Sequence, residues 1–171
     1  MQQIVEALRE RGPLTGKELL SAVPMDDLAL WAACHRSELV NSRIVSRRYL
    51  RLDKRVEGFA RLSPSIMREF YNYTVLGLAE HSPEIEPRAQ QLERELARIS
   101  KMKFDLAQQT MEQLVAGLAE KQQIKEAAVF MIAGDVVYGM AHGEPRPESS
   151  TGELVRGSDL DIIVVVEDLP A

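Results

Sequence analysis

Several residue types that often carry structure or chemistry are scarce in this sequence. The 171-residue chain contains one cysteine, one tryptophan and three histidines. The single cysteine, Cys34, excludes an internal disulfide and is typical of a reducing compartment, and we expect it to be a small core residue. Because His35, His81 and His142 do not have the spacing of metal ligands, the sequence does not favour a zinc site.

Long apolar runs are also missing. No segment approaches the ~18 consecutive apolar residues that a membrane-spanning helix needs. The amino-terminal MQQIVEALRERG has the charged, amphipathic pattern of a helix and not that of a signal peptide. Because 45% of the residues are hydrophobic and 27% are charged, we expect a folded, cytoplasmic protein without a membrane segment.

Charge is distributed unevenly along the chain. Residues 1–62 contain eleven Lys and Arg against eight Asp and Glu, whereas residues 63–171 contain ten against eighteen. A basic first part followed by an acidic remainder indicates parts with different roles. A further change of pattern near residue 124 divides the chain into residues 1–62, 63–124 and 125–171.

Residues 1–62 have the pattern of three short helices followed by two strands. The first helix ends at Gly12-Pro13, and Thr15 with Glu18 forms a capping box for the second. A third helical segment, MDDLALWAACHRSEL, precedes two strand-like runs, RIVSRRYLRL and GFARL, which a charged turn joins. Three helices and a hairpin in this order resemble a winged helix-turn-helix, a DNA-binding module.

The predicted wing is rich in basic residues: Arg43, Arg47, Arg48, Arg51, Lys54 and Arg55. Such a wing could lie along the phosphate backbone of DNA, with an affinity that falls as the salt concentration rises. The third helix, however, begins with Asp26 and Asp27, which phosphate would repel. The basic residues could instead pair with acidic residues of the same chain or of a second copy, and both interpretations stay open.

Residues 63–124 are predicted to be a helical connector. One helix begins at Pro64, is capped by Ser63, and extends to about residue 80. A second, much longer helix covers about residues 84–124, and its first part has a heptad seam formed by Ile85, Ala89, Leu92, Leu96 and Ile99. We expect this seam to join two copies in a homodimer. Packing against the helix of residues 64–80 in the same chain is the alternative.

Residues 125–171 have the pattern of a strand, a polar loop and a second strand. The second strand, DIIVVV, follows GSDL, so that Asp159 and Asp161 stand one residue apart. In an extended segment their carboxylates point the same way and repel each other unless a divalent cation lies between them. Mg²⁺ binds carboxylates together with phosphate oxygens, and Gly157 and Ser158 offer backbone N–H groups and a hydroxyl to a phosphate.

The string GSDLDIIVVV resembles the metal-binding strand of the polymerase-β-type nucleotidyltransferase superfamily. The resemblance implies an earlier strand that ends in a glycine turn, for which AAVFMIAGD supplies Gly134 and YGM supplies Gly139 as an alternative. It also implies Mg²⁺ as cofactor, a nucleoside triphosphate as substrate, and Asp159 and Asp161 as catalytic metal ligands. The nucleotide-binding positions would be Gly134, Gly157 and Ser158.

The family pattern is not complete in this chain. The family places a third carboxylate on a later strand, but after Asp161 only Glu167 and Asp168 remain. At ~3.3 Å per residue they lie about 20 Å along the same strand. We therefore expect the full catalytic set to be lacking, because the chain is a fragment, an inactive homologue, or a domain that a partner completes.

Together these patterns predict a mainly α protein with an α/β carboxy-terminal part. A winged helix-turn-helix (1–62) is followed by a connector with a dimerisation helix (63–124) and a partial nucleotidyltransferase-like sheet (125–171). The first predicted function is metal-dependent nucleotidyl transfer, incomplete or inactive in this chain. The alternative is a dimeric winged-helix DNA-binding transcriptional regulator whose carboxy-terminal domain is vestigial or senses a ligand.

Overall fold

The computed structural model describes residues 1–45, 64–119, 121–147 and 152–167. The chain divides into two compact units, Met1–Arg94 and Glu95–Ala171. Most residues of the described chain lie in helices, and the strands form small antiparallel sheets. The prediction of a mainly helical protein with a mixed carboxy-terminal part is confirmed at this level. None of the described helices is both long and apolar enough to cross a membrane.

The first unit begins with the three predicted helices, α1 (Gln2–Arg11), α2 (Gly16–Ala22) and α3 (Asp27–Arg36), with the short strand β1 (Leu14–Thr15) after α1. The predicted capping box is present, because Glu18 N donates to Thr15 Oγ1 at 3.2 Å and Thr15 N donates to Glu18 Oε2 at 2.7 Å. Asp26 caps α3 in a similar way, accepting hydrogen bonds from two backbone N–H groups of its first turn.

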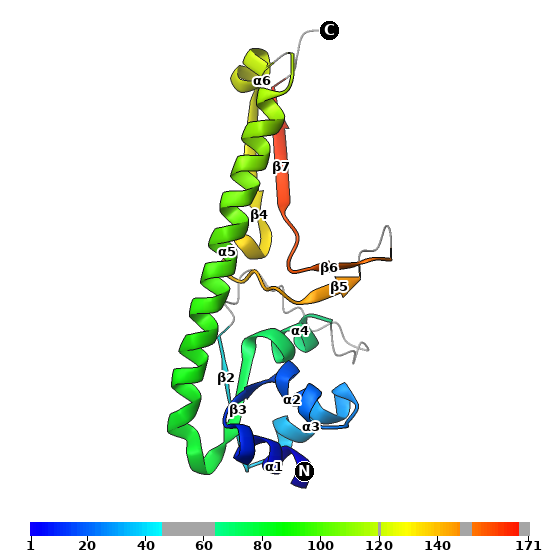
Figure 1. The fold of residues 1–171 in the computed structure, drawn as a ribbon, viewed down its shortest axis with the longest axis vertical. Helices are drawn as coiled ribbons and strands as arrows, with labels where there is room; N and C mark the ends of the chain where they lie inside the picture. Colours follow the sequence, from blue (N-terminus) through cyan, green and yellow to red (C-terminus); the bar gives the residue numbers. More distant parts are fainter. Residues whose placement is uncertain (46–63, 120, 148–151, 168–171) are drawn as a thin grey trace, which may run out of the picture. The chain divides into compact units, whose positions relative to one another are not determined.

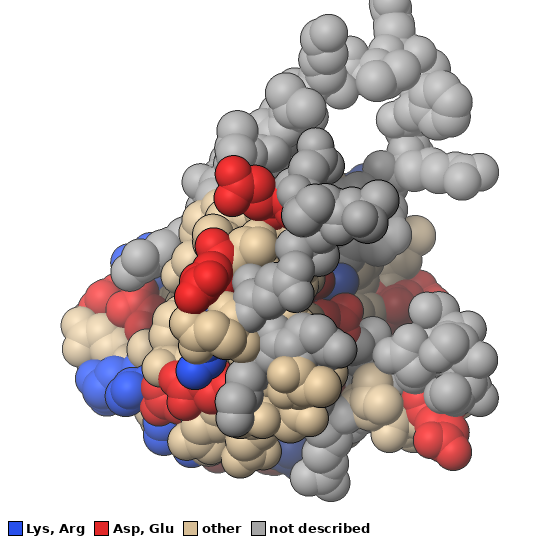
Figure 2. All heavy atoms as spheres, turned by 90° about the horizontal axis from the view of Figure 1, so that it is seen from above, with Lys and Arg blue, Asp and Glu red and all other residues tan. Residues whose placement is uncertain are grey.

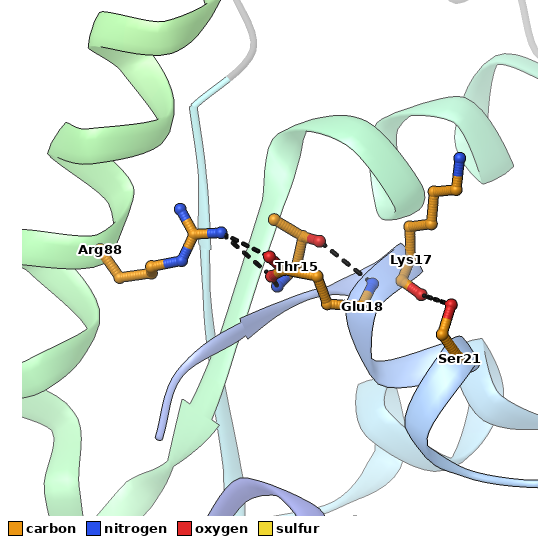
Figure 3. Close-up of polar contacts among 5 residues, drawn as sticks. All are labelled: Thr15, Lys17, Glu18, Ser21 and Arg88. Carbon is orange, nitrogen blue, oxygen red and sulfur yellow. Dashed lines mark hydrogen bonds and ion pairs between the residues drawn. The ribbon is translucent and has the colours of Figure 1, made fainter. Parts of the chain in front are cut away.

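Figure 3 shows that a residue from a distant helix completes this capping arrangement. Arg88 Nη2 donates to both carboxylate oxygens of Glu18, at 2.8 and 3.0 Å. Glu18 therefore contacts the backbone of its own helix start and a guanidinium group at the same time. The contact fixes the start of α2 against the segment that carries Arg88.

The sheet of the first unit is built around a strand that the sequence pattern did not predict. Helix α4 (Pro64–Tyr73) begins at the predicted proline, but it ends at Tyr73 and does not continue to residue 80. Strand β3 (Thr74–Leu78) follows and lies between β1 and β2 (Val40–Ile44), antiparallel to both (Figure 1). Every residue of β3 is buried. The sequence TVLGL therefore forms a central strand covered on both faces, where the period of two is lost.

This sheet and the surrounding helices share one hydrophobic core. Its most deeply buried members include Ile4, Leu19, Leu30 and Leu76. They come from α1, α2, α3 and β3, so each of these elements is held by apolar packing. The predicted hairpin falls largely on residues 46–63, which lie outside the described chain, and the partner of β2 in the structure is β3.

The long predicted helix is present as α5 (Ile85–Ala116) and follows the 3₁₀ turn η1 (Ala79–Glu84). It is shorter than expected, because it ends at Ala116 and a separate helix, α6 (Lys121–Ala127), follows. Four residues of the predicted heptad seam are buried within this one chain: Ile85, Ala89, Leu92 and Leu96. These four side chains are thus covered without a second copy, and Ile85 lies against Gly77 of β3; packing against the helix of residues 64–80 stays a prediction. A homodimer stays a prediction, and its interface would need other side chains.

The second unit contains the two predicted strands as an antiparallel pair, β4 (Ala128–Ala133) and β7 (Asp161–Val166) (Figure 1). The polar loop between them holds the turn η2 (Gly134–Val136) and a short pair of strands, β5 (Pro145–Pro147) and β6 (Leu154–Arg156). One face of the β4–β7 ribbon carries Val129, Met131, Ile163 and Val165, which are between 43% and 60% exposed. On the opposite face Phe130, Ile132 and Ile162 are half-buried, whereas Val164 and Val166 are 48% and 52% exposed.

Candidate metal and nucleotide site

Asp161 and Gly134 lie next to each other at one end of the β4–β7 ribbon. The register pairs Ala133 with Asp161, so Gly134 follows directly after the residue opposite the aspartate. Gly134 has φ +74°, and a Cβ atom built on it would overlap Asp161 Oδ2 and lie 3.1 Å from Cγ. The position therefore requires glycine for two reasons, its backbone conformation and the carboxylate that lies against it.

The structure also separates the two glycine turns that the sequence left as alternatives. Gly139 has a similar φ of +71°, but a Cβ atom on it would have no atom within 4 Å. Gly134 is the turn that approaches an aspartate of the Asp-x-Asp pair. The pairing of this glycine with Asp161 brings together two segments that are far apart in the sequence.

The turn at Gly157 and Ser158 is held by hydrogen bonds to the segment around His142. Gly157 N donates to the carbonyl of Glu144 at 2.8 Å, and Ser158 N donates to the carbonyl of His142 at 3.1 Å. In return, His142 N donates to Ser158 Oγ at 3.1 Å. Both backbone N–H groups that we expected to contact a phosphate are thus bonded inside the protein, and contact with a phosphate would have to replace these bonds; the role of Gly157 and Ser158 in nucleotide binding stays a prediction. The hydroxyl of Ser158 still has its own proton to donate.

Helix α5 anchors the same turn from the other side. Lys103 Nζ donates to the carbonyl of Ser158 at 2.6 Å. One turn earlier on α5, Ser100 Oγ accepts from Ala141 N at 2.9 Å. Sequence reasoning missed both residues. The available signal was a serine and a lysine at inward positions of an amphipathic helix, four and seven residues after the buried Leu96.

The two aspartates are placed differently from one another. Strand β7 begins at Asp161, whereas Asp159 lies in the segment before it, and both residues are exposed. Two accessible carboxylates match the way proteins bind Mg²⁺, which takes one or two carboxylates and completes its shell with water and phosphate oxygens. The type of ligand therefore suits that ion, and Mg²⁺ binding stays a prediction. Among the described residues, no group of three His, Cys, Asp or Glu side chains comes together that could hold a metal.

The candidates for a third carboxylate do not lie near this pair. Glu167 follows the far end of β7, where its N–H donates to the carbonyl of Ala127 at 2.8 Å. Asp168 lies outside the described residues. The site consists, in the part of the chain that the structure describes, of the aspartate pair, Gly134 and the buried turn at Ser158.

Only one of the predicted DNA-contacting residues can be located. Arg43 is exposed on β2, where its Nε lies 3.3 Å from Glu86 Oε2 and its Nη1 donates to the carbonyl of Ile44. The others, Arg47, Arg48, Arg51, Lys54 and Arg55, lie outside the described residues. On the described surface seen in Figure 2, acidic and basic side chains are interspersed and form no single basic patch.

The acidic start of α3 is reinforced by its surroundings. The hydroxyl of Tyr71 donates to Asp27 Oδ2 at 2.6 Å. This hydrogen bond, followed by one from the backbone of Leu28, lowers the pKa of the Asp27 carboxyl below its usual value. Asp27 therefore keeps its negative charge at the start of α3, the helix that the winged-helix prediction would place against DNA.

No protein-family model matches the chain, and no curated protein or solved structure is significantly similar to it. The chemistry of the site is thus defined by its own residues. They are two exposed carboxylates, a glycine whose backbone gives one of them room, and a buried serine turn that a lysine contacts.

Proposed function

We propose that the second unit is a nucleotidyltransferase-like domain that binds Mg²⁺ together with a nucleoside triphosphate. The observation that supports this most directly is the contact of Gly134 with the carboxylate of Asp161. In the resembling superfamily, a strand ending in a glycine turn precedes the strand with the aspartates. Here the two corresponding strands pair in a register that brings the glycine to the second aspartate.

In this proposal some residues supply negative charge for the ion and others supply the shape of the site. Asp159 and Asp161 hold the ion, and Gly134 leaves the space that the Asp161 carboxylate occupies. The Ser158 hydroxyl is 8% exposed and accepts from His142 N, so in this proposal its part is to hold the turn that precedes Asp159. When bound, Mg²⁺ would neutralise the triphosphate and make its α-phosphorus easier to attack. Since the described residues supply no third carboxylate, we propose nucleotide binding with little or no turnover by this chain alone.

The test is calorimetric titration of the full chain with Mg²⁺-ATP. Asp161→Asn keeps the size of the side chain and removes its charge, so it should weaken binding at least tenfold, about 1.4 kcal/mol. Glu167→Gln is the matched control, because it removes a carboxylate from the other end of the same strand. Equal heats from wild type and Asp161→Asn would contradict the proposal.

A second function, DNA binding by the first unit, is favoured by one specific observation. The elements occur in the order α1-β1-α2-α3-β2-β3, apart from the inserted α4, and the sheet order is β1-β3-β2. Three short helices followed by a strand of an antiparallel sheet support the resemblance to a winged helix-turn-helix, in which α3 would be the recognition helix. A DNA-binding first unit would agree with the alternative function, a regulator whose carboxy-terminal domain is vestigial or senses a ligand.

A gel-shift titration with duplex DNA at two salt concentrations tests this second function. Binding through basic residues should weaken steeply as salt rises, because each neutralised phosphate releases counterions. The control is the Arg47→Gln/Arg48→Gln double variant, which removes two charges of the predicted wing. A complete lack of shift at low salt would refute DNA binding.

A further inference from the structure

We propose that Lys103 is a positioning residue for the metal site, because it fixes the turn from which the aspartate pair begins. The inference rests on the proposed Mg²⁺–nucleotide function. It adds a residue that lies on another element, helix α5, and far from Asp159 and Asp161 in sequence. The resemblance to the superfamily, which covers only the carboxy-terminal part, does not include it.

The contact acts on the peptide group that leads directly into Asp159. Lys103 Nζ lies 2.6 Å from the carbonyl oxygen of Ser158, and that carbonyl belongs to the peptide bond with Asp159. A hydrogen bond from a charged donor is shorter and stronger than one between neutral groups. The direction in which the chain leaves the turn is therefore set by a charge-assisted bond from a helix.

The space around the turn leaves few alternative conformations. Gly157 has φ +85°, and a Cβ atom on it would lie 2.5 Å from the carbonyl oxygen of His142 and 3.0 Å from Lys103 Nζ. The lysine ammonium and the backbone of His142 thus pack against the glycine closely. A side chain at this position would have to displace a backbone carbonyl group as well as the lysine.

The turn is also tied down on its other side by buried groups. Two hydrogen bonds join Ser158 and His142: Ser158 N donates to the carbonyl of His142, and His142 N donates to Ser158 Oγ. Both residues are buried. The neighbouring residue Ala141 is in turn bonded to the buried hydroxyl of Ser100 on α5. Two residues of one helix, Ser100 and Lys103, therefore hold the two segments that meet at this turn. Groups that orient metal ligands in this way commonly change metal affinity by 10–100-fold when they are removed.

The experiment measures Mn²⁺ affinity by electron paramagnetic resonance, with and without ATP, on the full chain. Lys103→Met removes the charge and the hydrogen bond but keeps the length, and we expect 10–100-fold weaker Mn²⁺ binding. Lys103→Arg should restore part of the loss. The matched control is Lys101→Met on the same helix, where the lysine is exposed and pairs with Asp105 at 3.1 Å. Its Mn²⁺ affinity should equal that of wild type.

The outcomes separate the two proposals. If wild type does not bind Mn²⁺ with ATP, the proposed function fails and this inference fails with it. If wild type binds and a folded Lys103→Met binds equally well, the positioning role is refuted while the proposed function stands, even if the melting temperature has fallen. If circular dichroism shows that Lys103→Met is unfolded, Lys103→Gln takes its place under the same criteria.

Discussion

Replacing Gly134 with alanine is the most direct test of the geometry at the aspartate pair. The added methyl group would overlap the Asp161 carboxylate oxygen and lie 3.1 Å from its Cγ, and the backbone has φ +74°. The carboxylate must therefore move or the turn must open. Both responses displace the residue that we propose as a metal ligand.

The loss of folding stability caused by Gly134→Ala has two parts, and the variant Gly139→Ala separates them. An alanine with positive φ costs about 1–2 kcal/mol, offset by about 0.4–1 kcal/mol because the unfolded chain loses freedom. Gly139→Ala carries only this part, since its φ is +71° and nothing lies within 4 Å of the added atom. Gly134→Ala carries the collision as well, which adds about 0.5–1.5 kcal/mol if Asp161 is forced off its rotamer.

The assay compares urea unfolding and Mn²⁺ affinity for wild type and both variants. We expect both substitutions to lower the free energy of unfolding, Gly134→Ala by the larger amount. Only Gly134→Ala should weaken Mn²⁺ binding, by at least tenfold. If the two variants bind Mn²⁺ equally, Gly134 does not shape the metal site and the argument from its contact with Asp161 is wrong.

Two further predictions concern the first unit. Arg88→Met removes the bonds to Glu18 and should lower the free energy of unfolding by about 1 kcal/mol, more than Arg9→Met, which breaks an exposed pair with Glu80. The stabilisation by Arg88 is limited because its Nη1 is buried without a hydrogen-bond partner in the described residues. Equal losses for the two variants in chemical denaturation would contradict this prediction. Burial raises the pKa of the Cys34 thiol to about 11 from 9.0. As the pH rises, the thiol therefore ionises in the unfolded chain before it does in the folded chain, and the free energy of unfolding should fall between about pH 9 and 11. Cys34→Ala should remove that part of the pH dependence, and the same pH profile for Cys34→Ala and wild type would contradict the prediction.

Local signals in the sequence predicted the elements that local interactions determine. Thr15 and Glu18 indicated the start of α2, and the capping box is present. Pro64 indicated the start of α4 in the same way. The apolar runs AVFMIA and DIIVVV both form strands. In each case neighbouring residues supply the hydrogen bonds or the backbone preference, so no distant partner is needed to recognise the pattern.

The errors came from contacts between distant parts of the chain. The spacing of Phe70, Tyr73 and Leu76 continued a helical pattern across residues that form β3, because a strand buried on both faces has no period of two. A β-branched pair, Thr74 and Val75, was the only local hint. The heptad seam of α5 was correctly identified as apolar, but the sequence could not show which surface would cover it.

In the candidate site, too, local features could be predicted from the sequence and contacts between distant residues could not. Asp159 and Asp161 were identifiable because their charges stand next to an apolar strand, where like charges are costly. The contact between Gly134 and Asp161 depends on strand register, and that of Lys103 with Ser158 on how a helix meets a loop. Neither follows from spacing. The N–H groups of Gly157 and Ser158 are a further example. The sequence shows that a loop has such donors, but it does not show which groups accept their hydrogen bonds.

The uncovered face of the β4–β7 ribbon has a practical consequence for work in solution. Val129, Met131, Ile163 and Val165 form an accessible apolar row, and within the described residues each of the two strands pairs only with the other. A β-branched ribbon with open edges readily recruits further strands, which favours aggregation. We therefore expect aggregation to limit the protein concentration that these titrations can use. A lysine in place of Val165, far along the ribbon from Asp161, should keep the chain dispersed without touching the carboxylates.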